Sequence, residues 1–195
     1  MTNFARIPFL DDEGAYQWFT SFDSLGDLIE NPNPTPALRY LEQITEHLTK
    51  DCGWPVNRIH LFGYAQGGSV AIEFVLERWK DQLLQQSSKK GIQDLPSSIP
   101  LASVVSISGA LLSYPTLSSP CSTPVLFAHR TTSGPSAISI FQKAFSSVSE
   151  SQLITSRNQG MPSSNEEWES IMRFWSEKLS RRQEELYEVM SQEVI

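Results

Sequence analysis

The sequence has few of the residues that mark several large classes of protein. It contains only two cysteines in 195 residues, and no apolar run approaches the roughly 20 residues that a membrane-spanning helix needs. Cys52 and Cys121 lie far apart and form no CxxC pair. We therefore expect two free thiols in a reducing compartment and no membrane span.

Histidines are equally scarce. There are three, and none has the spacing of a metal ligand or an acidic cluster beside it, so we expect no metal and no cofactor. His47 falls on the polar side of a predicted helix and is expected to be exposed. His60 alternates with apolar residues on a predicted strand and is expected to pack against a neighbouring helix.

Positive charge is in the minority. The chain has 15 Lys and Arg against 22 Asp and Glu, which gives a net charge of −7. Nucleic-acid binding needs a cationic face, so we expect no nucleic-acid partner. The N-terminus, MTNFARIPFL, lacks the charged segment and apolar run of a signal peptide. The expected location is the cytoplasm, with the nucleus as the other compartment.

What the sequence does contain is an alternation of strand-like and helix-like segments. Helices are predicted from Thr35 to Gly53, from Gln66 to Leu84, over residues 136–148 and from Ser164 or Asn165 onward. Strands are predicted over residues 59–62, 101–109, 124–130 and 152–156. This order predicts an α/β fold with a mostly parallel sheet flanked by helices. We expect a single domain over residues 1–195, with residues 181–195 as a projecting or frayed helical tail.

The most informative stretch is RIHLFGYAQGGSVAIEF, residues 58–74. An apolar strand, a tight glycine turn and a helix follow one another, as in the nucleophile elbow that presents a catalytic serine. The apex of the turn is Ala65, which has no nucleophile. Gly63, Gly67 and Gly68 allow close backbone approach, and the N–H of Gln66 stands where an oxyanion donor would be.

With its lead-in, PVNRIHLFGYAQGGSVAIEF resembles the elbow of the phospholipase/carboxylesterase family, which includes the acyl-protein thioesterases and reads Gly-Phe-Ser-Gln-Gly-Gly at this point. RIPFLDDEGAYQWF, SVVSISGALL, PVLFAHR and EEWESIMRFWSEKL resemble further segments of the same family. The likeness covers most of residues 7–180, and it implies an α/β-hydrolase fold.

The catalytic residues of that family are missing. Ala65 takes the place of the serine. The family's acid lies in a His-Gly-x-x-Asp pattern, and Ser133 stands at the end of the matching run, which begins at His129. The family's base is a histidine before the last helix, and QGMPSSNEEW has none; its place falls near Met161. The resemblance also implies that His129 is structural.

An upstream strand of the family is missing too. That strand ends in His-Gly-x-Gly-Asp and donates the second oxyanion hydrogen bond. Without it, residues 58–63 would form an exposed apolar edge of the sheet. Three explanations are open: the chain is N-terminally truncated relative to the family, a partner chain covers the edge, or the N-terminal region fills the gap. We favour truncation.

These absences favour an inactive protein, or pseudoenzyme, that keeps a cleft for an acyl or ester small molecule, a lipidated protein or another protein partner. The alternative is an active serine hydrolase of the acyl-protein thioesterase type that cleaves carboxylic esters or thioesters. A weaker third reading is an interaction protein that acts through its acidic helical tail.

Overall fold

The computed structural model describes residues 5–6, 16–88, 99–130, 135–153 and 160–192; of residues 5–6, 86–88, 135–137 and 180–192 it describes only the backbone. The helices are α1 (Thr35–Glu46), α2 (Gln66–Ser88), α3 (Pro135–Ala144) and α4 (Asn165–Gln192), and a π-helical turn (His47–Asp51) extends α1. The strands are β1 (Ala5–Arg6), β2 (Tyr16–Gln17), β3 (His60–Tyr64), β4 (Ser103–Ile107), β5 (Val125–His129) and β6 (Val148–Gln152).

Four strands form the central sheet in the order β3-β4-β5-β6, and each neighbouring pair is parallel. All four strands therefore end at the same edge of the sheet, which is where α/β proteins place their sites. The expected fold class, a mostly parallel sheet flanked by helices, is confirmed.

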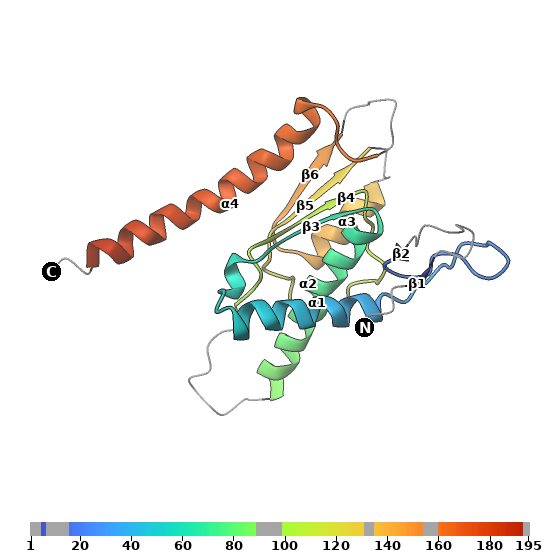
Figure 1. Ribbon diagram of the computed structural model, residues 1–195, viewed down its shortest axis with the longest axis horizontal. Helices are drawn as coiled ribbons and strands as arrows, with labels where there is room; N and C mark the ends of the chain where they lie inside the picture. Colours follow the sequence, from blue (N-terminus) through green and yellow to red (C-terminus); the bar gives the residue numbers. More distant parts are fainter. Residues whose placement is uncertain (1–4, 7–15, 89–98, 131–134, 154–159, 193–195) are drawn as a thin grey trace.

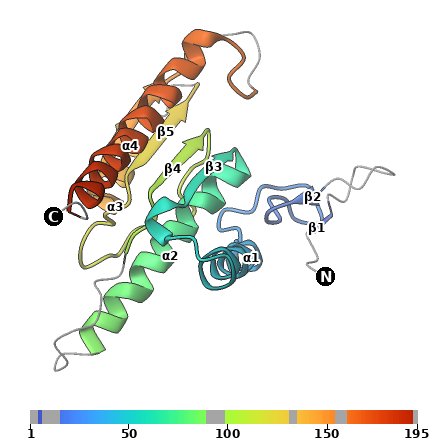
Figure 2. The ribbon, with the colours of Figure 1, turned by 60° about the vertical axis from the view of Figure 1, so that its left-hand side comes forward.

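The two faces of the sheet are covered by different helices. On one face, Val104, Val125 and Phe127 pack with buried side chains of α1, α2 and α3. On the other face, alternate positions such as Val105 and Leu126 pack with side chains of α4. Figure 2 shows α4 on one side of the sheet and α1 and α2 on the other. β4 and β5 are buried on both faces, which explains their nearly continuous apolar sequence.

Some boundaries differ from the sequence prediction. β3 does not stop at Gly63 but continues to Tyr64. Helix α3 ends at Ala144 and not at residue 148, and β6 covers Val148–Gln152, whereas the strand was predicted over residues 152–156. The chain leaves the helix early because Phe145 forms a β-bridge with Cys121. β6 lies at the outer edge of the sheet and is largely exposed. Its sequence VSESQ is therefore polar and lacks the apolar residues from which a strand is predicted.

The elbow strand β3 lies at the other edge of the sheet. Strands β1 and β2 pair with each other in a separate antiparallel sheet, so in the described part of the chain they do not fill the place beside β3. Along β3, Phe62 is 40% exposed even though it stacks on Trp168 and contacts Trp175 of α4. An edge strand with exposed aromatic side chains is thus present, as expected.

Helix α4 is much longer than the sheet that it covers. Ile171 and Phe174 in its N-terminal half are buried against the sheet. The C-terminal half extends past the end of the strands in Figure 1. Within the described residues, no helix is both long enough and apolar enough to cross a bilayer.

Candidate functional site

The turn between β3 and α2 has the geometry of a nucleophile elbow. Ala65, between the last residue of β3 and the first of α2, has a φ of 49°, in the left-handed region that residues with a Cβ rarely adopt. Its N–H donates to Ile107 O at the end of β4 at 2.8 Å, and its carbonyl accepts from Ser69 N at 3.1 Å. A strained residue held at both ends by backbone hydrogen bonds is the form that places a side chain above a sheet.

Glycines allow α2 to approach the strand ends. A Cβ atom at Gly63 would overlap the carbonyl oxygen of Gly67, and one at Gly68 would lie 2.5 Å from Ser106 Oγ on β4. Gly67 faces the Trp18 indole, whose Nε1 would lie 3.3 Å from such an atom. The three predicted elbow glycines are therefore together at the turn, each at a close approach.

Gln66 links the elbow to the N-terminal segment. Its Oε1 accepts from the backbone N–H of Trp18 at 3.0 Å. Its Nε2 donates to Phe19 O at 3.2 Å and to Ser21 Oγ at 2.7 Å. The backbone of Gln66 opens α2, at the positive end of the helix dipole, as the oxyanion role requires. The side-chain role was not predicted from the sequence, because the contacts span more than forty residues.

A buried ion pair connects the C-terminal end of β5 with the first turn of α4. Arg130, directly after β5, pairs with Glu167 of α4; their side chains are 9% and 2% exposed. Arg130 also donates from Nε to Gly160 O at 2.9 Å and from an NH2 group to Met161 O at 3.1 Å. The Met161 segment is thereby fixed against the end of β5, and the Met161 side chain is 37% exposed. Ser133 lies outside the described residues.

Glu167 is held in its charged form. The hydrogen bond from Arg130 comes first among the causes that lower the pKa of Glu167 from 4.5 to about 2, and the N–H of Ser163 adds to it. The same carboxylate accepts from Ser163 N at 2.8 Å, and Glu167 N is capped by Ser164 Oγ at 3.3 Å. Sequence reasoning missed this network, because its partners are 37 residues apart.

The three histidines lie in different elements of the fold. His60 Nδ1 lies 2.8 Å from Ser103 Oγ on the neighbouring strand β4, and its packing against a helix stays an expectation. His129 is buried, stacks on Phe127 and hydrogen-bonds Glu150 at 2.8 Å. His47 is exposed on the turn after α1. Among the described residues, no three His, Cys, Asp or Glu side chains are placed to hold a metal ion.

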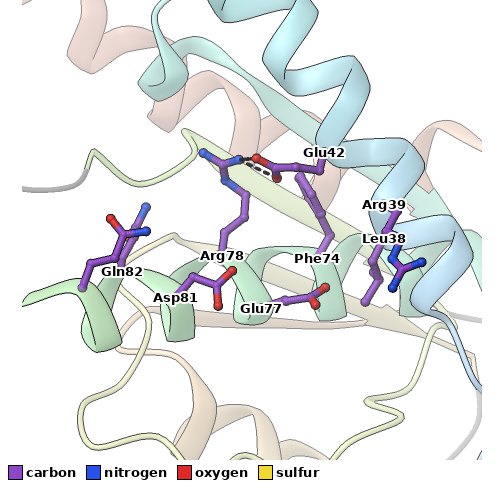
Figure 3. Close-up of a pocket in the computed structure, with 9 residues that line it drawn as sticks. Leu38, Arg39, Glu42, Phe74, Glu77, Arg78, Asp81 and Gln82 are labelled. Atoms are coloured by element: carbon purple, nitrogen blue, oxygen red, sulfur yellow. Dashed lines mark hydrogen bonds and ion pairs between the residues drawn. The ribbon is translucent and has the colours of Figure 1, made fainter. Parts of the chain in front are cut away.

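A cavity of about 290 Å³ lies between α1 and α2. Figure 3 shows Arg78 reaching across it to Glu42, with which it makes hydrogen bonds of 2.6 and 2.7 Å. Glu77 also lines it, and burial followed by the charge of Asp81 raises the pKa of Glu77. The lining residues come from the middle and C-terminal part of α2 rather than from the elbow, so the cavity is separate from the candidate site.

No known protein-family profile matches the chain. One curated relative is an uncharacterized hydrolase, UM10204 of Mycosarcoma maydis, which is 33% identical over 181 residues. The match covers 91% of this chain but only 63% of the relative's length, so the chain spans less than two thirds of that protein.

Three solved structures have a similar fold. A variant of SOBER1 from Arabidopsis thaliana gives a TM-score of 0.57 at 17% identity, over 85% of this chain and 77% of that one. Esterase PE8 gives a TM-score of 0.55 at 18% identity, over 83% of this chain and 70% of that one. YahD, solved with malic acid, gives 0.55 at 13% identity, over 87% and 77%.

The chain has the α/β-hydrolase fold. The α/β-hydrolase fold that the resemblance implies is thus confirmed. Within this α/β-hydrolase, a second strained residue lies beside the elbow: Ser108, after β4, has a φ of 56°, and its N–H donates to Ala128 O at 2.7 Å. It was not predicted, since strain at a strand end leaves no pattern in the sequence.

Gly63→Ala tests the close approach at the elbow. The new methyl group would overlap the Gly67 carbonyl, which belongs to rigid backbone, so we expect the free energy of unfolding to fall by about 2 kcal/mol or more. Gly160→Ala is the control, because nothing lies within 4 Å of its Cβ position, and its effect should stay within about 0.5 kcal/mol. Urea unfolding measures both. Equal effects would contradict the close approach.

Glu167→Gln tests the buried ion pair. The pKa of Glu167 is lower in the folded than in the unfolded chain, so its stabilising effect is complete above pH 4.5 and is lost as the pH falls towards about 2. We expect Glu167→Gln to lower the urea midpoint at pH 7 and to flatten the loss of stability between pH 5 and pH 2.5. Glu166→Gln, on an exposed neighbour, should keep the wild-type slope; a wild-type slope in Glu167→Gln would refute the interpretation.

Proposed function

We propose that this α/β-hydrolase is a pseudoenzyme that does not cleave esters or thioesters and acts by binding. One observation carries the proposal: the left-handed apex of the elbow is Ala65, whose methyl group cannot attack a carbonyl carbon. Removing the serine or the histidine of a triad lowers the rate on the order of a millionfold.

The other triad positions support the same conclusion. The place of the base falls near Met161, where the chain has no imidazole, and the place of the acid falls at Ser133. Near Met161, the Arg130–Glu167 ion pair and its hydrogen bonds occupy the polar groups at the end of β5. These groups therefore stabilise the loop, and Glu167, whose pKa is lowered to about 2, is too weak a base to take a proton from a nucleophile at neutral pH.

Binding requires only the scaffold that remains. The N-terminus of α2 directs its first N–H groups and a partial positive charge towards the space above Ala65. A carbonyl or carboxylate group of an acyl or ester ligand, free or on a lipidated protein, suits that environment. Two free cysteines are compatible with the reducing cytoplasm, where we propose that the protein acts.

The second candidate is an active serine hydrolase of the acyl-protein thioesterase type. It is favoured by the hydrolase name of the Mycosarcoma maydis relative, which extends well beyond the region matched here.

A partner chain along the β3 edge also stays a prediction. The edge location of β3 and the exposed ring of Phe62 support it.

Restoring the nucleophile separates the two candidates. Wild-type protein should not react with a fluorophosphonate probe, which labels activated serines, and Ala65→Ser should also stay unlabelled because no base deprotonates the new hydroxyl. With p-nitrophenyl acetate and butyrate, we expect both proteins to remain at the rate of buffer alone.

The control is heat-denatured protein at the same concentration, which corrects for the slow reaction of surface nucleophiles. Substantial turnover by Ala65→Ser would reveal a base that the described residues do not show. Labelling of the wild type would favour the active hydrolase instead.

A further inference from the structure

A thiol, an imidazole and a carboxylate lie in a row at the end of α1, well apart from the elbow in the sequence. Cys52 Sγ is 3.8 Å from His47 Nε2, and His47 Nδ1 is 2.6 Å from Asp51 Oδ2. A nucleophile within reach of a base, with the base oriented by a third group, is the arrangement that activates cysteine and serine nucleophiles.

The π-helical turn produces this alignment. In an α-helix only positions three and four residues apart share a face, so Asp51 would reach His47 but Cys52 would not. Here the N–H of Cys52 bonds His47 O at 3.1 Å, the five-residue step of a π-helix, which moves Cys52 towards the imidazole. Gly53, with a φ of 70°, then ends the helix, and Trp54 N returns to Leu48 O at 2.9 Å.

The direction of the hydrogen bonds follows from the groups themselves. An ionised carboxylate only accepts, so the hydrogen of the short bond to Asp51 is on His47 Nδ1. In the neutral ring, Nε2 then carries the lone pair and faces the thiol. The proton of Cys52 can move to Nε2, and the resulting imidazolium is stabilised by Asp51.

The site is open to reagents. Cys52 is a free, exposed cysteine, and the His47 and Asp51 side chains are 65% and 67% exposed. The other cysteine provides a contrast within the same chain. Cys121 is buried, and burial raises the pKa of its thiol. Only Cys52 combines access with a neighbouring base, since Cys121 is 1% exposed.

We propose that Cys52 is a modification site at which hydroperoxides oxidise the thiol to a sulfenic acid, with His47 as the base and Asp51 as the residue that positions His47. In the reaction, Cys52 Sγ attacks the outer oxygen of the peroxide as its proton passes to His47 Nε2. An S–O bond forms and the O–O bond breaks. The leaving oxygen takes the proton from Nε2, so hydrogen peroxide yields water, sulfur is oxidised by two electrons and the peroxide is reduced.

This chemistry is independent of the proposed function, because none of its three residues belongs to the elbow or to the β5 end. It also differs from metal binding, for which the described side chains form no suitable group. The exposed position limits the acceleration. We expect His47 to increase the rate of Cys52 oxidation about tenfold. A positioned base in an active site increases a rate by roughly a hundredfold or more.

The experiment measures sulfenic acid formation in the native full chain. Protein is treated with hydrogen peroxide in the presence of dimedone, and the adducts at Cys52 and Cys121 are followed over time by peptide mass spectrometry. The reference is a synthetic peptide of residues 50–54, which contains the thiol without His47. We expect the Cys52 adduct to form about tenfold faster than the peptide adduct and the Cys121 adduct to form more slowly than either.

Variants then test the roles of the two neighbours. His47→Gln should lower the Cys52 rate to that of the peptide, and Asp51→Asn should give an intermediate rate. Gln43→Ala, an exposed change one turn earlier in α1, should keep the wild-type rate, and circular dichroism should show all three variants folded. A wild-type rate in His47→Gln, or a native Cys52 no faster than the peptide, would overturn the proposal.

Discussion

The structure depends on how closely the first turn of α2 approaches the ends of β3 and β4. Gly63 and Gly68 have no Cβ at two of the tightest points, and Ala65 adopts a left-handed conformation to connect strand and helix. If that approach were lost, α2 would separate from the sheet, and α2 carries much of the larger core, including Phe74 and Val70. The turn is therefore a requirement of packing as well as a place for chemistry.

This double role explains how the elbow can persist without a nucleophile. The strain at Ala65, of order 1–2 kcal/mol for a left-handed residue with a Cβ, is offset by backbone hydrogen bonds to Ile107 and Ser69 and by the burial of α2. Replacing a serine by alanine removes the hydroxyl but leaves these backbone hydrogen bonds and the burial of α2 unchanged. The elbow can thus keep its geometry whether or not its apex carries a hydroxyl.

Long-range polar contacts fix the loops around the site. Gln66 binds the segment from Trp18 to Ser21 through three hydrogen bonds, and Arg130 joins the end of β5 to the start of α4 through Glu167. Both sets of contacts stabilise the loops at this end of the sheet.

Local patterns in the sequence determined the parallel sheet, the order of its elements and the elbow with Ala65 at its apex, because period, glycine spacing and turn chemistry act over a few residues. They misplaced β6, whose polar VSESQ is a strand only because it pairs with β5 at the edge. The Arg130–Glu167 pair was likewise invisible, since folding alone brings together groups far apart in the chain. Even the row formed by Asp51, His47 and Cys52, which lie within six residues of one another, was not predicted. It depends on the π-helical turn, whose geometry is set by how α1 ends and not by residue type.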